Sequence, residues 1–163
     1  HDGWDDATAR LDPAPAGAAL AEAFEVCGAA GLQAFGVWTA GAVHHAIAST
    51  GGVRLEDRVT DGFMKVMARA EDGRSGLASQ AARESGVLDA GALARRAVER
   101  VGDGSPPADL GPGEYPVILA PEAVGLLLEF LGALAFDGQA HVEGRGALSD
   151  RLGSAVVQTT YGR

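Results

Sequence analysis

Cysteine, aromatic residues and long apolar runs are scarce in this sequence. Of its 163 residues, one is a cysteine, Cys27, and 6% are aromatic. A single thiol excludes a disulfide framework within the chain and is typical of a reducing compartment, so we expect a cytoplasmic protein. No apolar run reaches the roughly 18 residues that a membrane span needs, and no apolar leader stands at the N-terminus. We therefore expect no membrane partner.

Basic residues are also few. The chain has 13 Lys and Arg against 22 Asp and Glu, which gives a formal charge of −9 and a pI near 4.8. Because phosphate binding depends on clustered Lys and Arg, this balance disfavours direct nucleic-acid binding. The apolar fraction of 47% is that of a globular protein, and 24 glycines indicate many turns.

The chain is predicted to contain one folded domain. Residues 1–16 hold two prolines and several acids without an apolar period, which predicts a linker or a trimmed N-terminal segment. Residues 17–163 are long enough for a single core. The first residue is His1 rather than Met, so we expect a piece of a longer protein.

Three stretches have a helical period. They are residues 16–31, which Gly31 should end, residues 90–101 with Asp89 as N-cap, and residues 121–136 with Pro121 in the first turn. The residues predicted to face the core are Leu20, Phe24 and Cys27 in the first helix, and Leu93, Ala97 and Val101 in the second.

Short alternating runs punctuated by glycine fill residues 32–85 and predict an antiparallel meander of four or five strands. "EYPVILAP" (114–121) and "SAVVQTT" (154–160) predict two further strands, and residues 137–153 a Gly-rich loop. The fold class expected is α+β, an antiparallel sheet with helices packed on one face. The other face, rich in Thr, Ser, Arg and Asp, should be free for water or a partner.

Two segments carry a resemblance to a known family. "GEYPVILAPEAVGLLLEFLGALAFDGQAHVEGRGALSDRLG" (113–153) has a strand ending in proline, a "VGxLL" helix, a polar loop and then "GR" and "LG". Residues 58–101 contain a hairpin with an Asp-Gly turn followed by a helix. In this order the parts resemble the TldD/TldE (PmbA) family, also called modulators of DNA gyrase. The resemblance implies a fragment of a larger TldD/PmbA-like chain.

The resemblance also implies an active-site position. TldD-type subunits carry a His-Glu-x-x-x-His motif whose positions fall here on Leu128 to Ala133, with Glu129 retained and both histidines replaced, by Leu128 and Ala133. Zinc needs lone-pair donors, which these two side chains lack, so we expect no metal in this chain. Without a metal-bound water to deprotonate, Glu129 would be the relic of a general base, and no catalytic residue is predicted.

This pattern is closest to the TldE (PmbA) subunit of the family. The resemblance implies a TldD-like metalloprotease partner that holds the zinc, a peptide substrate, and assembly as a homo- or heterodimer. An alternative is a regulatory module that docks a protein partner without proteolysis. A further alternative is an enzyme whose metal ligands lie beyond residue 163.

Several residues allow both a functional and a structural interpretation. Trp38 is a candidate for lining a peptide groove on the open sheet face, or it is core. Adjacent His44 and His45 should point to opposite faces of a strand and cannot chelate one metal. His141 and Glu143 could share a face of an extended segment, but no third ligand accompanies them.

Two further sequences invite a catalytic interpretation without supporting it. "EDGRSG" (71–76) has neither phosphate-loop nor nucleophile-elbow spacing, so it predicts a hairpin turn. Cys27 should pack as a small apolar side chain, since no histidine partner can be assigned to it.

Overall fold

The computed structural model describes residues 3–102 and 109–155. The chain divides into two compact units, His1–Leu110 and Gly111–Arg163. The expectation of a single domain over residues 17–163 is therefore wrong. Its physical reason is that every strand of the described sheet lies before residue 83, so no strand from the second unit extends that sheet.

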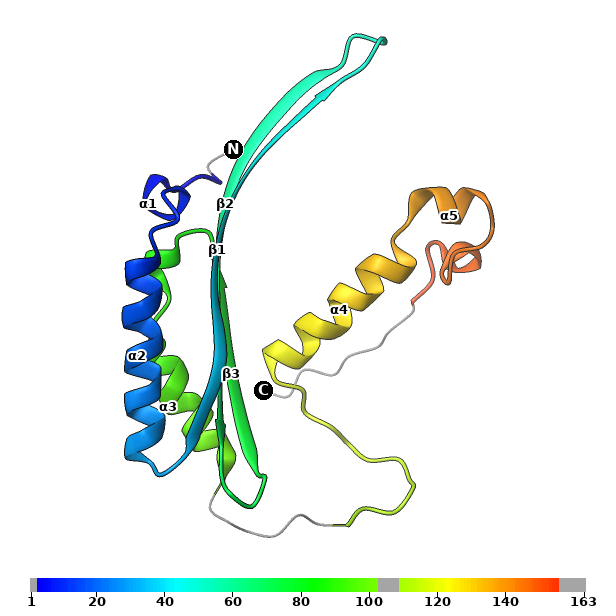
Figure 1. Cartoon of the computed structure of the whole chain (residues 1–163). Helices are drawn as coiled ribbons and strands as arrows, with labels where there is room; N and C mark the ends of the chain where they lie inside the picture. Colours follow the sequence, from blue (N-terminus) through cyan, green and yellow to red (C-terminus); the bar gives the residue numbers. More distant parts are fainter. Residues whose placement is uncertain (1–2, 103–108, 156–163) are drawn as a thin grey trace. The chain divides into compact units, whose positions relative to one another are not determined.

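The first unit is built on a three-stranded antiparallel sheet in the order β1-β2-β3 (Figure 1). The strands are β1 (Gln33–Ala48), β2 (Arg54–Arg69) and β3 (Ser75–Ala82). The α+β class with an antiparallel sheet is confirmed, but the strands are fewer and longer than expected. The turns at Gly52 and Gly73, both with φ of 90°, are the Gly-Gly and Asp-Gly turns that the sequence predicts.

Two glycines that were expected to separate strands lie inside them. Gly41 is in the middle of β1, where it pairs with Asp61, and Gly62 on β2 pairs with Ala40. A Cβ on Gly41 would lie 2.4 Å from Oδ1 of Asp61. Gly41 therefore makes room for the Asp61 side chain of the paired strand, and Gly62 for Ser85 and Leu88, a role that sequence patterns do not distinguish from a turn.

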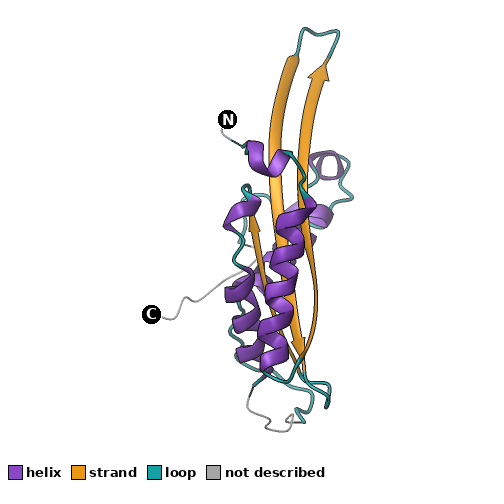
Figure 2. Ribbon diagram, turned by 60° about the vertical axis from the view of Figure 1, so that its left-hand side comes forward, coloured by secondary structure: helices purple, strands orange, loops and turns teal. Residues whose placement is uncertain are grey.

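All the helices of the first unit cover one face of the sheet (Figure 2). They are α1 (Asp6–Ala9), α2 (Pro13–Ala29) and α3 (Ala90–Val101), with the 3₁₀ turn η1 (Ser85–Val87). Asp89 caps α3 as predicted, accepting a hydrogen bond from Ala92 N. Gly31, with φ of 71°, follows the end of α2 and its N–H donates to the carbonyl of Gly28.

The N-terminal segment is not a linker. Asp5 caps α1 and Asp12 caps α2, which begins at Pro13, so residues 1–16 contain one short helix and the first turn of another. The carbonyl of Gly3 accepts the backbone N–H of Thr60 on β2 at 2.9 Å. Thr8 is buried, donates to the Asp5 carboxylate at 2.7 Å and accepts the Ser85 N–H at 2.8 Å. These bonds tie the segment to the sheet just beyond the end of β3.

The core lies between the sheet and the two longer helices. Alternate side chains of β2 point into it, among them Met64, Val66 and Ala68, all at most 2% exposed. Cys27 is fully buried, and the predicted α3 face is buried at Leu93, Ala97 and Val101. The prediction for Phe24 is wrong: its side chain is 55% exposed, although it shares α2 with Cys27.

The second unit contains α4 (Pro121–Ala135), α5 (Gly138–Val142) and the 3₁₀ turn η2 (Ser149–Arg151). The expected loop over 137–153 is thus partly helical, because Asp137 caps α5 by accepting from Gln139 N and Ala140 N. The expected strand over 114–121 is absent, and Ile118 is fully exposed. A strand needs a neighbour for its backbone groups, and the described part of this unit offers none.

The expected last strand, 154–160, falls mostly outside the described residues, and Ser154 and Ala155 are not in a strand. Across residues 3–102 and 109–155, no helix has the length and apolar character required to cross a membrane.

Candidate functional site

The positions that correspond to the family's metal-binding motif, Leu128 to Ala133, lie on α4. This is the most apolar helix of the second unit. Pro121 stands in its first turn, where the missing N–H costs no hydrogen bond. Its large side chains are about half exposed or more in this unit: Leu126, Leu127, Leu128, Phe130 and Leu134. No residue of α4 is buried, so its apolar surface is open.

The motif positions do not form a metal site. Leu128 and Ala133 lie in one continuous α-helix, five residues apart. Neither side chain has a lone pair to donate. Glu129 is exposed on the same helix and has no histidine beside it, which supports its interpretation as a surface carboxylate.

No other metal cluster is found in the part of the chain that the structure describes, where no three His, Cys, Asp or Glu side chains converge. The candidate pair His141 and Glu143 lies at the end of α5 rather than on an extended segment. Glu143 is engaged elsewhere, since it accepts hydrogen bonds from Arg145 Nε and Gln139 Nε2. The Arg145 bond is the main reason that the pKa of Glu143 lies below its usual value.

The adjacent histidines of β1 occupy opposite faces, as predicted. His44 Nε2 lies 3.6 Å from Glu56 Oε2 on the helix-bearing side of the ribbon. His45 is opposite Asp57 in the strand register, on the other side. The two imidazoles therefore lie on opposite faces of the sheet and cannot bind the same metal ion.

Trp38 is not on the open face of the sheet. Its side chain is on the helix-covered face and packs partly buried against the core. It also lines a cavity of about 270 Å³ with Pro15 of α2 and with Arg10 and Leu88, which directly follow α1 and η1. The prediction that Trp38 lines a groove on the open face is therefore wrong. Side chains alternate along a strand, so the even-numbered residues of β1, including Trp38, point towards the helices and the odd-numbered residues point to the open face.

The open face of the sheet is more apolar than expected. Phe35 and Val37 on β1 are 48% and 39% exposed, and the same face carries the half-buried Phe63, Met67 and Leu77. Lys65, Asp61 and Thr39 interrupt this apolar surface. The polar residues expected on this face are present, but aromatic and aliphatic side chains lie between them.

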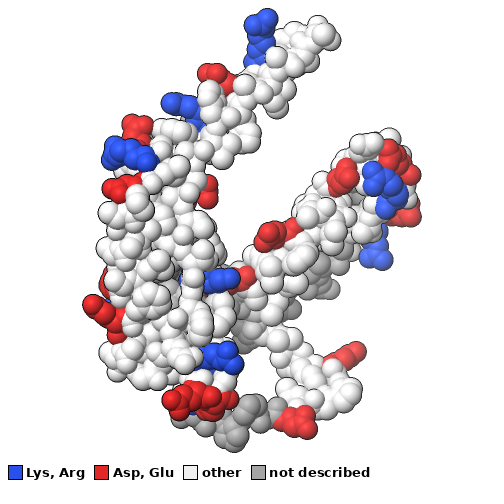
Figure 3. Space-filling view, viewed as in Figure 1, with Lys and Arg blue, Asp and Glu red and all other residues white. Residues whose placement is uncertain are grey.

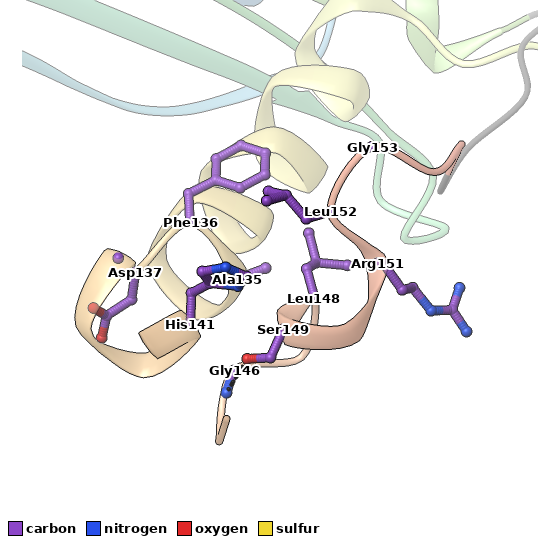
Figure 4. A pocket seen from close by; sticks show the side chains of 11 residues that line it. Ala135, Phe136, Asp137, His141, Gly146, Leu148, Ser149, Arg151, Leu152 and Gly153 are labelled. Atoms are coloured by element: carbon purple, nitrogen blue, oxygen red, sulfur yellow. Dashed lines mark hydrogen bonds between the residues drawn. The ribbon is translucent and has the colours of Figure 1, made fainter. Parts of the chain in front are cut away.

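Sequence reasoning missed a cavity of about 360 Å³ in the second unit (Figure 4). Its walls include Phe136, His141, Leu148 and Leu152, and the Arg151 side chain extends away from it. The cavity exists because α5 and η2 fold back beside the end of α4. The one signal for it was Asp137, a good helix N-cap in a segment otherwise dominated by glycine. An apolar side chain fits such walls.

Charged side chains are dispersed. On the face seen in Figure 3, Lys and Arg are scattered among Asp and Glu over the described residues, without a basic patch. Such a surface lacks the concentrated positive charge on which phosphate binding depends.

Comparisons with known proteins identify the family. A sequence model of the PmbA/TldA metallopeptidase central domain matches residues 10–103, and one of the PmbA/TldA metallopeptidase C-terminal domain matches residues 112–160. The chain belongs to the PmbA/TldA metallopeptidase family. The two matches meet between residues 103 and 112, where the structure also divides into its two units.

A solved structure shares the PmbA/TldA fold of this chain. It is a Thermotoga maritima protein named as a candidate modulator of a DNA gyrase, with 20% sequence identity and a TM-score of 0.78. The match covers 94% of this chain and 37% of that protein, so the chain spans little more than a third of its length. No curated protein matches the sequence. The sequence resemblance to the TldD/TldE (PmbA) family is thereby confirmed.

Proposed function

We propose that this chain belongs to a TldE (PmbA)-like subunit without a metal, which pairs with a zinc-bearing TldD-like chain in a protease for unfolded or small peptides. The observation that carries the proposal is the pair Leu128 and Ala133 on α4, in a family described as metallopeptidases. The family description favours peptide hydrolysis, and these two residues favour a subunit that leaves the metal chemistry to its partner.

The proposed roles of the two subunits follow from the chemistry of zinc. A catalytic zinc takes three protein ligands and activates a bound water for attack on the peptide carbonyl. The residues of α4 do not fit such a metal, since the side chains of Leu128 and Ala133 supply no imidazole or other lone-pair donor at the two motif positions. This chain would therefore contribute binding surface to a shared chamber, and the fragment itself would be catalytically silent.

The test combines metal analysis with peptide cleavage. The protein is purified without chelator, its zinc is measured by mass spectrometry, and cleavage of an unfolded fluorescent peptide is followed with and without a TldD-like chain. We expect no bound zinc in this protein alone and cleavage in the mixture only. The matched control replaces the first motif histidine of the TldD-like chain by alanine, which should abolish cleavage. Stoichiometric zinc in this protein alone would overturn the proposal.

A second candidate is a regulatory module that docks a protein partner without proteolysis. It is favoured by the apolar side chains on the open sheet face and by the gyrase-related name of the Thermotoga maritima protein. The net charge of −9 disfavours direct contact with DNA in that role. Cleavage in the mixture with a TldD-like chain would reject it. Stable binding of a protein partner, with no cleavage in any mixture, would support it.

A further inference from the structure

The cavity of about 270 Å³ that Trp38 lines lies where segments far apart in the sequence meet. The turn between α1 and α2 contributes Arg10 and Asp12, and α2 contributes Pro15. Trp38 comes from β1, and Leu88 directly follows η1. The cavity is slightly smaller than the roughly 300 to 1,000 Å³ of ordinary ligand pockets, so a ligand for it must be small. The proposed peptidase role gives this cavity no task.

Hydrogen bonds within the protein hold the walls of the cavity in place. Ser85 N donates to Thr8 Oγ1 at 2.8 Å, which ties η1 to α1. Thr8 Oγ1 donates in turn to the Asp5 carboxylate at 2.7 Å. Asp12 Oδ1 accepts the N–H of Ala14 at 2.9 Å and so fixes the start of α2. Because the protein's own bonds order these walls, a ligand would bind there with little loss of conformational entropy in the protein.

The inner part of the cavity is apolar. Trp38, Ala19 and Leu88 are partly buried and pack against the core, and Pro15 adds a further apolar wall. The indole N–H of Trp38 makes no hydrogen bond to any residue that the structure describes. Indole N–H groups that are removed from water usually have an acceptor, so this donor is available to a ligand.

Two side chains of opposite charge line the same cavity. Arg10 and Asp12 are both exposed, and Arg10 makes no hydrogen bond or ion pair with the described residues. Its charge acts on Asp5, whose pKa is lowered mainly by the hydrogen bond from Thr8 and least by Arg10. Asp12 uses Oδ1 for Ala14 N, and its other oxygen accepts no hydrogen bond within the described part of the chain. A guanidinium and a carboxylate oxygen are therefore available to a ligand.

The residue between these two charges has a strained backbone. Leu11 has φ of 52°, and it is the only non-glycine residue with a positive φ among the residues described. Non-glycine residues in this conformation cost free energy and cluster at active sites and ligand clamps. The strained turn is what places Arg10 and Asp12, on either side of Leu11, along one cavity.

We propose that this cavity binds a free α-amino acid with an apolar side chain. The ligand carboxylate accepts hydrogen bonds from the Arg10 guanidinium and the Trp38 indole, and the ligand ammonium donates to Asp12. The ligand side chain lies against Pro15 and Leu88. A simple anion would be repelled by Asp12 and a simple cation by Arg10, so a ligand with both charges fits best. The inference does not depend on peptide hydrolysis, and no residue of the second unit takes part.

The test is calorimetric titration of the chain with L-leucine at pH 7, with tryptophan fluorescence as a second readout. We expect one molecule bound per chain. N-acetyl-leucine lacks the ammonium, leucinamide lacks the carboxylate and glycine lacks the apolar side chain, so each should bind at least tenfold more weakly. No binding of leucine at millimolar concentration would overturn the inference, as would leucinamide or glycine binding as tightly as leucine. Equal binding of N-acetyl-leucine would overturn it in favour of the C-terminal residue of a peptide.

Variants connect the binding to this cavity. Arg10→Gln should raise the dissociation constant for leucine at least tenfold, and Arg10→Lys should restore part of the affinity because it restores the charge. The matched control is Arg96→Gln, which removes the same charge from an exposed position on α3 that does not line the cavity and should leave the affinity unchanged. Trp38→Phe removes the indole N–H and should both weaken binding and abolish the fluorescence change. Unchanged affinity in Arg10→Gln and Trp38→Phe would place the ligand elsewhere and overturn the inference.

Discussion

The close approach of β3 to α3 makes Gly76 the most demanding glycine of the first unit. A Cβ at this position would lie 2.1 Å from the carbonyl oxygen of Ala97 and 2.7 Å from backbone atoms of Arg100 and Val101. All three neighbours are backbone, so no side-chain rotation can relieve the overlap. An ordinary contact begins near 3.4 Å, so the last turns of α3 would have to move outward by about 1.3 Å.

Gly76→Ala should therefore destabilise this unit strongly. Overpacking in a tightly packed interior costs about 1 to 3 kcal/mol, and because the neighbours are backbone atoms of α3 that cannot rotate away, we expect the upper end, near 3 kcal/mol. The displacement would also separate Ala97 and Val101 from the sheet, which adds lost contacts to the steric strain. The assay is urea unfolding followed by far-ultraviolet circular dichroism, with the free energy of unfolding extrapolated to water.

The matched control is Gly17→Ala on α2. Nothing lies within 4 Å of a Cβ there, and the position is inside a helix. Because glycine costs a helix about 0.5 to 1 kcal/mol relative to alanine, this variant should be more stable than the unmodified chain. If Gly76→Ala unfolds at the same urea concentration as the unmodified chain, the contact between β3 and α3 is not as close as described and the reasoning fails.

Three further predictions concern the reactivity of the Cys27 thiol, the loss of stability at low pH and zinc binding on α4. Cys27 is buried and its pKa is raised by desolvation, so a thiol reagent should label it only as fast as the chain unfolds; rapid labelling of the native chain would contradict its burial. The hydrogen bond from Arg74 lowers the pKa of Asp72, so its stabilising contribution is present above the ordinary value of 3.8 and is lost as the pH falls through the lowered pKa. Asp72→Asn should thus unfold at lower urea than the unmodified chain at pH 7 and match it at pH 2; an equal difference at both would refute the assignment. Leu128→His with Ala133→His should not bind zinc tightly, because a zinc site needs at least three protein ligands and no three His, Cys, Asp or Glu side chains converge in the described part of the chain, and a tight site found by calorimetry would refute this reasoning.

Local signals in the sequence predicted α2 and α3 of the first unit, although they missed the short helix α1. Asp89 and Gly31 act at a cap and at a helix end, and such effects are set by residues within one turn. These local signals do not decide which apolar residues of a helix are buried. Phe24 is exposed and Cys27 is not, although both fit a helical period, because burial depends on the sheet and on α3 rather than on α2 alone.

The strands were harder to predict because glycine has two roles in a sheet. At Gly52 and Gly73 it adopts a positive φ and makes the turns that were expected. At Gly41 and Gly62 it lies within long strands, where its missing side chain makes room for a neighbour. The sequence of a single strand does not reveal that neighbour. The same limitation misplaced Trp38, whose face is decided by the register of the whole ribbon.

The candidate site was predictable only where chemistry depends on residue type. Leu128 and Ala133 cannot ligate zinc in any fold, so their effect on a metal site follows from the sequence. The cavity beside Phe136 was not predictable, because it requires α5 and η2 to fold back on the end of α4. His141 was considered as a metal ligand and instead lines that cavity, together with Phe136, Leu148 and Leu152.

The bonds made by the first residues of the chain bear on where a domain boundary can be drawn. The central-domain match begins at residue 10, yet Gly3 and Thr8 bond to β2 and to the segment after β3. A fragment begun at residue 10 would leave the Thr60 N–H without the carbonyl that it meets here and would expose part of the sheet beside it. Residues 3–9, which lie outside the matched region, therefore contribute hydrogen bonds to β2 and to the segment after β3, and a fragment trimmed to the family boundary should be less stable.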